Sequence, residues 1–587
     1  MKKNSIGKAS ASKNYFKLPG DEVGQDMANA ALFSKSRNSE KVSRSCWEWL
    51  TVVLLAVWAF SLHIHRLMCA GALWRDEISS IKVASAANWH DFYLAQKYDS
   101  FPLFNVFLLR IWMMLKGGTL AEVAANDTYL RMFGMLGGLV LLGVIVWSAM
   151  KVFNSLPVFS LALFALSPSV IQWGDSIRAY SLGAALSVLF MGMMWRLLHE
   201  PSLKKFILCT LVAVLMVWTL YGNAFFVLAI CIAASAVALS RRDWGLLLKV
   251  VGIGFVAALS LLLNFKIFSE MGILKEAVAQ YITLQLITKS WWDAWSESGA
   301  WFGVIWLLAI GLSVVVALKI LCGSQNSAIS EKSREFGVYI LLILVLSIGG
   351  FLCYLQIVDV PPQVWYFIPI GAVVSAAVDG LWPMLGRRKV VLPIQIGLCI
   401  VLTATTASGT FKAQRQKLTN LDLVADLMRK RATEGDLIII APLYPACSLV
   451  RYYHGPAKVQ VWPPHKPDEL AFQRVDVLLS AMHSKEEAIP PLLEDIGLTL
   501  RNGGRVWMMG DIVVVPGNQP PPWVQPGTQF LGQSQVGPYL YTWGAQVFHY
   551  LVNNAKSATV TDELDVSQVN RWEAIRQVVV FDGWNKN

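Results

Sequence analysis

Apolar residues fill long stretches of this chain, and polar residues gather in the short segments between them. Eleven stretches approach the roughly 20 residues that a helix needs to cross the hydrocarbon core of a bilayer. They lie near residues 47–67, 128–150, 152–171, 177–198, 204–221, 223–240, 244–267, 300–322, 336–357, 364–385 and 390–409. The pattern predicts a polytopic α-helical membrane protein with about eleven transmembrane helices.

One further apolar segment, Leu103–Leu115, is too short to be a span and contains Arg110. Apolar segments of about 10–14 residues are typical of helices that lie in the membrane interface. We therefore expect residues 68–127 to form one external loop with two amphipathic helices on the membrane surface, near 77–95 and 103–116.

Beyond Gly409 the pattern changes to helical periods that alternate with short β-rich runs, which predicts a soluble α/β domain over residues 410–587. The expected helices are Asp422–Arg431 and Lys485–Asp495, and the expected strands are Leu437–Ala441, Val475–Ser480 and Arg505–Met509. The proline-rich stretch 516–527 is predicted to be an extended linker before a β-rich end.

The composition agrees with lipid as the main solvent, because 55% of the 587 residues are hydrophobic and only 15% are charged. Residues 410–587 hold 17 Lys and Arg against 17 Asp and Glu, so the net charge of +11 belongs to the rest of the chain. Residues 1–45 are polar and basic, which indicates a disordered cytosolic tail. Nothing in this distribution indicates a nucleic-acid partner.

The topology follows from the clusters of Lys and Arg between the spans, because cytoplasmic loops carry the excess of these residues. The clusters alternate so that the N-terminus is cytoplasmic and the C-terminal domain is external. The eight cysteines are scattered singly, which favours unpaired thiols, with a Cys69–Cys447 disulfide as the alternative.

In this topology the polar residues that stand out fall at the outer face. Ionisable groups next to membrane spans are costly and indicate a functional site. The expected outer-face residues are Asp76, Glu77, Asp99, Arg131, Asp175, Arg178, Tyr180, Tyr221, Asn223, Asp359, Gln363, Trp365 and Tyr366. We expect one external polar cavity at this face.

Four ordered motifs carry a family resemblance: Trp74–Glu77, Tyr98–Phe104, Tyr129–Arg131, and Ser167-Pro168 followed by Asp175–Leu182. They resemble the successive signatures of C-type (GT-C) membrane glycosyltransferases, near the bacterial relatives of protein O-mannosyltransferases and of the lipid A aminoarabinose transferase. The resemblance covers roughly residues 48–230 and implies a GT-C catalytic domain over 46–409. It also implies a bacterial inner (plasma) membrane protein, with the C-terminal domain in the periplasm.

The resemblance implies an enzyme that transfers a hexosyl or pentosyl group from a polyprenyl-phosphate donor to an acceptor, with inversion. By the family pattern Asp76 is the general base. Arg178 is our candidate for the charge of the leaving phosphate, because a guanidinium matches phosphate oxygens bidentately. Glu77 is assigned to the catalytic pair with Asp76, and Glu77 and Asp99 are predicted to orient the acceptor.

Arg131, Asp175, Tyr180 and Tyr366 complete the predicted substrate-binding set. No cofactor is otherwise indicated, but Glu77 and Asp99 are also the candidate ligands of a divalent metal ion. The acceptor is a protein, a lipid or a polysaccharide, and the sequence does not choose among them.

Other readings of these residues stay open at this point. Asp76 and Glu77 also suit the first turn of a helix, where acidic residues cap the backbone. Arg131 and Arg178 also suit headgroup contacts, and Trp365 and Tyr366 the interfacial aromatic belt. The alternative function is a transporter or flippase of lipid-linked glycan intermediates, in which the acidic residues relay protons.

Overall fold

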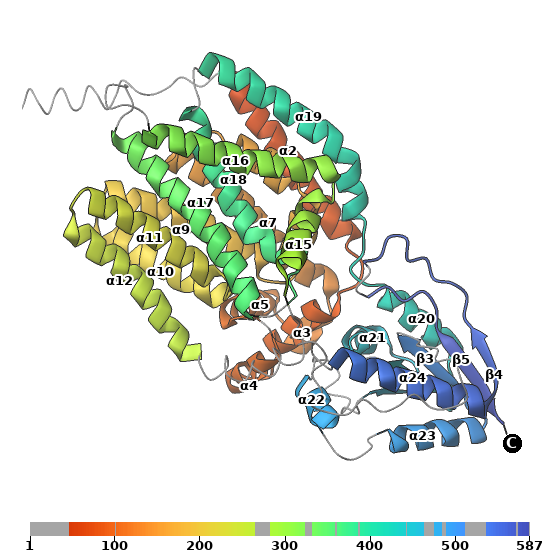
Figure 1. Ribbon diagram of the computed structural model, residues 1–587. Helices are drawn as coiled ribbons and strands as arrows, with labels where there is room; N and C mark the ends of the chain where they lie inside the picture. Colours follow the sequence, from red (N-terminus) through yellow and green to blue (C-terminus); the bar gives the residue numbers. More distant parts are fainter. Residues whose placement is uncertain are drawn as a thin grey trace, which may run out of the picture. The chain divides into compact units, whose positions relative to one another are not determined.

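The computed structural model of the protein describes residues 46–99, 101–264, 282–322, 331–358, 361–384, 388–441, 443–462, 475–483, 489–510, 536–570 and 573–585. These residues are mostly helical, with one small sheet formed by strands from the last third of the chain (Figure 1). The predicted tail 1–45, the predicted linker 516–527 and Asp359 lie outside the described residues.

Among the described residues, eight helices are long and apolar enough to cross a membrane. They are α2 (Cys46–Cys69), α7 with its extension (Asp127–Val152), α9 (Tyr180–His199), α11 (Asn223–Ser240), α12 (Trp244–Leu261), α16 (Ala300–Cys322), α17 (Glu331–Val358) and η5 with α18 (Val364–Leu381). Each coincides with one of the eleven predicted stretches.

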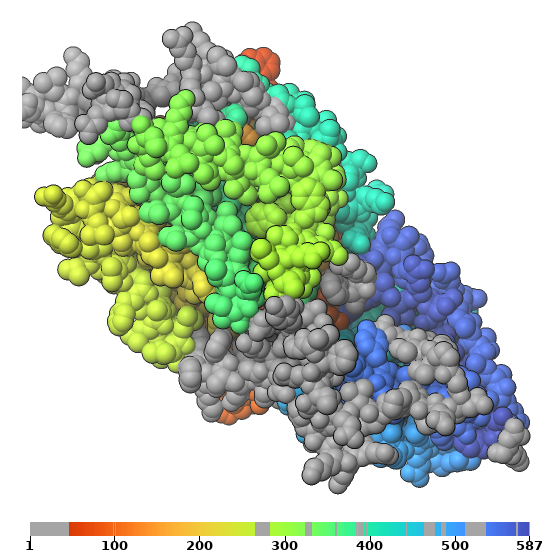
Figure 2. All heavy atoms as spheres, in the orientation of Figure 1, coloured from red at the N-terminus to blue at the C-terminus, as the bar shows by residue number. Residues whose placement is uncertain are grey.

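Apolar side chains cover the outside of this helical part as well as its inside. Helix α18 is buried along its whole length, from Ile368 to Leu381, whereas α12 exposes Leu248 and Phe255. Helices α16 and α17 form part of the face seen in Figure 2, and α16 exposes Leu308. An exposed apolar surface of this extent is stable where lipid replaces water.

The other three predicted stretches have different structures. Residues 152–171 form no single helix, because the π-helical turns η2 (Ser148–Val152) and η3 (Ser160–Ala165) precede a separate α8 (Pro168–Gly174). Proline cannot donate a backbone hydrogen bond, and Pro168 stands at the first position of α8, where none is needed. Residues 204–221 give α10 (Leu203–Thr219), and 390–409 lie within α19 (Arg388–Gln414). The count of eleven spans therefore stays a prediction.

The segment between α2 and α7 contains four short helices. They are α3 (Arg75–Ala84), α4 (Trp89–Ala95) with the 3₁₀ turn η1 (Gln96–Tyr98), α5 (Leu103–Lys116) and α6 (Leu120–Ala124). The predicted helix 103–116 is confirmed. The single predicted helix 77–95 is wrong, because Asn88 starts a new helix by accepting a hydrogen bond from the Asp91 N–H (2.9 Å).

Arg110 is the charged residue inside the apolar helix α5, and it is buried. Its Nη1 donates to the carbonyl of Ala84 (2.9 Å) and to that of Ala86 (2.7 Å), and its guanidinium lies over the Trp89 ring at 4.5 Å. Arg110 therefore binds the end of α3, where helix carbonyls have no partner in the helix.

Three further helices of the membrane part and the C-terminal part are α15 (Leu284–Ser296), α20 (Leu421–Arg431) and α21 (Ala446–Tyr452). The sheet contains β1 (Leu437–Ala441), β2 (Lys458–Val461), β3 (Val506–Gly510), β4 (Ala555–Val560) and β5 (Val579–Trp584) in the order β2-β1-β3-β5-β4. Strand β1 is parallel to β2 and β3, and β5 is antiparallel to β3 and β4. Helices α23 (Pro490–Arg501) and α24 (Val536–Asn554) pack against this sheet (Figure 1).

The predictions for this part are confirmed for α20, β1 and β3. The predicted strand at Val475–Ser480 is wrong, because α22 (Val475–His483) occupies these residues. Leu478, Leu479 and Met482 are buried, and Met482 follows the two leucines at the helical spacings of four and three residues. In an apolar run this short, the sequence pattern does not distinguish a helix from a strand. Residues 485–488 of the predicted helix 485–495 lie outside the described residues, and α23 covers the rest of it from Pro490. The described part of the predicted β-rich end contains helix α24 before strands β4 and β5. All eight cysteines are free thiols, so the alternative Cys69–Cys447 disulfide is not formed.

Candidate active site

Glu77 is the fully buried carboxylate of the first motif, and it joins three segments. Its oxygens accept hydrogen bonds from the backbone N–H of Trp74 (3.3 Å) and of Ile177 (3.1 Å), and Oε1 lies 3.5 Å from Nη1 of Arg131. The Trp74 contact is a capping interaction at the start of α3, as one reading of the sequence proposed. Glu77 thus fixes the start of α3 to α7 and to the segment before α9.

Arg131 is nearly buried and has its donors directed at protein atoms. Its Nε donates to the carbonyl of Gly71 (3.1 Å), and its Nη2 donates to that of Ala72 (2.6 Å). This corrects the reading of Arg131 as a headgroup ligand. These contacts hold the segment before α3 to α7, and the predicted contact of Arg131 with substrate stays a prediction.

Arg178 brings the first, second and fourth motifs together. Its Nη1 donates to three acceptors in the residues that follow α2: the backbone carbonyl of Asp76 (3.0 Å), Oγ of Ser80 (2.7 Å) and Oδ1 of Asp99 (3.0 Å). Ser80 in turn donates to Oδ2 of Asp99 (2.6 Å). Arg178 is only 6% exposed and lies 4.0 Å above the Phe101 ring, so it does not reach out as a headgroup ligand would.

Asp76 differs from these neighbours because its carboxylate is partly exposed. Its side chain keeps 22% of its accessible surface, and Nε of Arg75 lies 3.7 Å from Oδ1. The backbone of Asp76 is held by Arg178, and the next residue, Glu77, is fixed on both oxygens. The structure therefore places an accessible carboxylate on a rigid and buried support.

Aromatic side chains surround this support. Trp74 lies 5.3 Å from Trp173 and 5.8 Å from Trp365, and Trp173 lies 4.2 Å from Trp365. Tyr180 lies 5.3 Å from Phe101. A dry aromatic environment strengthens electrostatic interactions, because little water screens the charges.

Tyr366, predicted to bind substrate, lies beside Trp365 of the aromatic group, with 6.2 Å between the two ring centroids. Asn223 does not join them, because its amide donates to the carbonyls of Gly183 and Met216 between neighbouring helices. The structure thus brings most, but not all, of the predicted outer-face residues together.

Asp175 is paired with a residue that the sequence analysis did not select. Nδ1 of His63, on α2, lies 2.8 Å from both carboxylate oxygens of Asp175, and both side chains are nearly buried. Burial raises the pKa of the Asp175 carboxyl, and the His63 partner opposes that shift. The pair is packed tightly, since a Cβ at Gly138 would clash with Oδ1 of Asp175.

Arg66 is a second missed residue on α2. Its Nη1 donates to the carbonyls of Gln414 (2.9 Å) and Gln416 (2.7 Å), and the side chain is 2% exposed. His63 and Arg66 are three residues apart and so share one helix face, near the end of a mainly apolar helix. Ionisable residues in that pattern are the signal that could have found them.

The C-terminal part also reaches the residues around Asp76. Glu573, in the segment before β5, accepts a hydrogen bond from the Arg75 N–H (3.3 Å) and one from the Ser448 hydroxyl (3.0 Å). The Tyr452 hydroxyl accepts from the Leu73 N–H (2.7 Å). Nothing local in the sequence around Glu573 indicates this placement.

The carboxylates do not fit the metal site that the sequence proposed. Both oxygens of Glu77 are engaged by N–H groups and Arg131, and both oxygens of Asp99 are engaged by Arg178 and Ser80. Across the described parts of the chain, no group of three or more His, Cys, Asp or Glu side chains is arranged to hold a metal ion. We derive no step through a metal.

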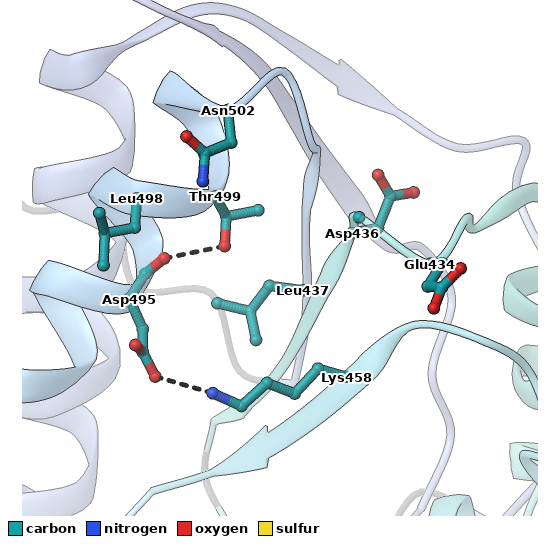
Figure 3. A pocket seen from close by; sticks show the side chains of 9 residues that line it. Glu434, Asp436, Leu437, Lys458, Asp495, Leu498, Thr499 and Asn502 are labelled. Atoms are coloured by element: carbon teal, nitrogen blue, oxygen red, sulfur yellow. Dashed lines mark hydrogen bonds and ion pairs between the residues drawn. The ribbon is translucent and has the colours of Figure 1, made fainter.

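A separate cavity of about 260 Å³ lies at the amino end of β1 (Figure 3). Its lining includes Asp436, Lys458 and Asp495, and Lys458 donates to Oδ2 of Asp495 (3.0 Å). None of the predicted site residues lines it. Asp436, also in the lining, accepts hydrogen bonds from Nη2 of Arg505 (2.8 Å) and Nε1 of Trp507 (3.0 Å) on β3 and the residue before it.

No protein-family profile and no curated protein matches the sequence. The fold is similar to that of ArnT from Cupriavidus metallidurans bound to undecaprenyl phosphate, with 10% identity and a TM-score of 0.49 over 79% of this chain and 94% of ArnT. It is also similar to the archaeal oligosaccharyltransferase AglB from Archaeoglobus fulgidus in complex with an inhibitory peptide and a dolichol-phosphate. That similarity has 11% identity and a TM-score of 0.41, over 79% of this chain and 69% of AglB.

Proposed function

We propose that this protein transfers a sugar from a polyprenyl-phosphate donor to an acceptor hydroxyl at the external face of the membrane, with inversion at the anomeric carbon. The observation that carries the proposal is the set of contacts of Arg178. Three motifs that are far apart in the sequence meet there, beside a partly exposed Asp76. This is the arrangement expected if the motifs build one site.

We assign Asp76 as the general base. The acceptor O–H gives its proton to the carboxylate while the oxygen attacks the anomeric carbon, and the bond from that carbon to the phosphate oxygen breaks. Attack on the side opposite the leaving group inverts the carbon. A base must be accessible to the acceptor and held in place, and Asp76 meets both conditions.

We assign Arg178 as the positive charge for the departing polyprenyl phosphate. Negative charge grows on the phosphate as the bond breaks, and a fixed cation in surroundings of low dielectric stabilises it. Arg178 is fixed by Ser80 on α3 and by Asp99, the residue after η1, and it lies over the ring of Phe101. Glu77, Arg131 and Asp99 then act as positioning residues, which hold α3 and Arg178.

The donor and the topology belong to the same proposal. Nucleotide sugars are confined to the cytosol, so an external site needs a donor that partitions into lipid. The helical part, with its eight to eleven membrane-spanning helices, offers a prenyl chain access from the surrounding lipid. We propose that the loop between α2 and α7 and the C-terminal part are external, on the side where the residues of the site gather.

The test is the substitution Asp76→Asn, which keeps the size of the side chain and its capping ability but removes the proton acceptor. General-base catalysis contributes about 10²–10⁴-fold, so transfer should fall by at least about two orders of magnitude. We would follow consumption of labelled polyprenyl-phosphate sugars in membranes that supply the acceptor, with equal amounts of folded protein.

The matched control is Asp562→Asn, at an aspartate whose side chain is 85% exposed and pairs only at the surface with Arg431. It should transfer at the wild-type rate. Undiminished transfer by Asp76→Asn would contradict the assignment of the base. A wild-type protein that moves lipid-linked sugars across the membrane without consuming them would support the transporter instead.

A further inference from the structure

Glu573 is a buried carboxylate from the C-terminal part that lies next to the proposed base. It is 3% exposed, and Oε1 accepts a hydrogen bond from the Arg75 N–H at 3.3 Å. Oε2 accepts from the Ser448 hydroxyl at 3.0 Å. The carboxylate is thus oriented on both sides, by α3 and by α21.

Arg75 lies between two carboxylates. Its Nε is 3.7 Å from Oδ1 of Asp76 and 3.8 Å from Oε1 of Glu573. Both distances are ion-pair distances and are longer than a good hydrogen bond. The guanidinium also lies 5.3 Å from the ring of Tyr444, another residue of the C-terminal part. Arg75 is therefore shared between Asp76 and Glu573.

The segment that carries Ser448 is fixed to the membrane part by several contacts. The Tyr452 hydroxyl accepts from the Leu73 N–H (2.7 Å) and donates to Oδ2 of Asp127 (2.6 Å).

The neighbouring Arg451 adds two contacts to the same loop. It donates to Oδ1 of Asp127 and to the carbonyl of Ala124. These contacts tie α21 to both ends of the loop between α2 and α7, so the position of Glu573 beside Arg75 is determined by a set of contacts.

We propose that Glu573 is a positioning residue for transfer: its negative charge draws Arg75 away from full pairing with Asp76 and so keeps Asp76 a strong base. This inference rests on the proposed function. A cation that pairs with a carboxylate stabilises its charged form and weakens it as a base, whereas a nearby negative charge does the opposite. The C-terminal part thereby contributes a residue without which the site is incomplete.

The charge of Glu573 is itself sensitive to pH. Burial raises the pKa of the Glu573 carboxyl to about 7, and Arg75 opposes that shift. The other groups that face it are the hydroxyls of Ser448 and Thr419, the carboxylate of Asp76 and the thiol of Cys447. Burial raises the pKa of Cys447 to about 12, so this thiol stays neutral near pH 7. Transfer should therefore rise as Glu573 ionises.

The test is Glu573→Gln, which keeps the shape and removes the charge. At about pH 8 its kcat should be about tenfold below wild type, with KM for the polyprenyl-phosphate sugar within about twofold, since one pKa unit of base strength corresponds to about a factor of ten. The wild-type rate should rise between about pH 6 and pH 8, and the variant should lack this rise. A purely structural role would not remove one limb of the pH profile.

The matched control is Glu563→Gln, at a glutamate whose side chain is 63% exposed. It should keep both the rate and the pH profile. Because Glu573 is proposed to act through Arg75, Glu573→Gln should have little further effect in an Arg75→Gln background. If Glu573→Gln does not fold, Ser448→Ala supplies the test, since it removes the hydroxyl that donates to Oε2 and should lower kcat about twofold to threefold.

The outcomes separate the two proposals. Active wild type, inactive Asp76→Asn and a Glu573→Gln variant with the wild-type rate and pH profile would overturn the role of Glu573 alone. Additive effects of the Arg75 and Glu573 substitutions would overturn the action through Arg75. Wild type without any transfer would overturn the proposed function and this inference with it.

Discussion

Two ionic clusters of the helical part are built from the same residue types but differ in what they support. In the first, around α3, the pairs Glu77–Arg131 and Asp99–Arg178 are buried and support the partly exposed Asp76. In the second, Arg241 after α11 binds both carboxylate oxygens of Glu335 on α17 and the carbonyl of Leu198 on α9. His199 completes this cluster, 3.4 Å from Glu335.

The difference lies in what the pairs leave accessible. The second cluster joins the ends of three helices, and its one carboxylate is bound bidentately by an arginine. The first cluster also ties segments together, but it does so around a carboxylate that is not buried with them. A buried ion pair therefore marks a constraint on the fold, and the accessible charge beside it marks the candidate for chemistry.

The comparison is sharpest at the adjacent residues Asp76 and Glu77. Glu77→Gln should lower the free energy of unfolding by about 3–5 kcal/mol, because it leaves Arg131 as a buried charge without its partner. Asp76→Asn should leave unfolding nearly unchanged. Unfolding in a denaturing detergent series would measure both. Normal stability of Glu77→Gln together with lost transfer would place Glu77 in the chemistry.

The next effect concerns Arg178, whose guanidinium is fixed by three acceptors. Arg178→Lys keeps the charge but loses the planar fork, which removes charge-assisted hydrogen bonds worth about 1.5–3 kcal/mol. The transfer rate should fall about tenfold or more, measured with equal amounts of folded protein. A wild-type rate in this variant would show that the leaving phosphate is stabilised elsewhere.

The smallest effect is expected in the second cluster. Glu335→Gln should cost about 1 kcal/mol of stability, because the pair is partly exposed and solvent screens it. Transfer per folded molecule should stay at the wild-type level. A loss of transfer as large as that of Arg178→Lys, with stability retained, would remove the distinction between the two clusters.

Local pattern was enough for the long apolar helices and for a few elements of the rest of the fold. Eight spans, α5, α20, β1 and β3 were predicted, because length and apolar periodicity decide them within each segment. Two of the wrong predictions occur where a single residue interrupts a helix that the apolar pattern alone would continue. Asn88 splits one predicted helix in two, and α8 begins at Pro168 inside a predicted span.

For the candidate site as well, the sequence supplied the residues and the structure supplied their contacts. The motifs contained Asp76, Glu77, Asp99 and Arg178, and the structure brings them together. The separate roles of Asp76 and Glu77 depend on burial and partners, which adjacent positions in a sequence do not reveal.

The sequence by itself determined that the chain is apolar enough to need lipid, and which ordered motifs are the candidates for the chemistry. Only the tertiary structure decided which charges are paired. His63 meets Asp175 across 112 positions, and Glu573 meets Arg75 across 498. The physical reason is that a helix is stabilised by neighbours in sequence, whereas a buried charge requires a partner that any part of the chain can supply.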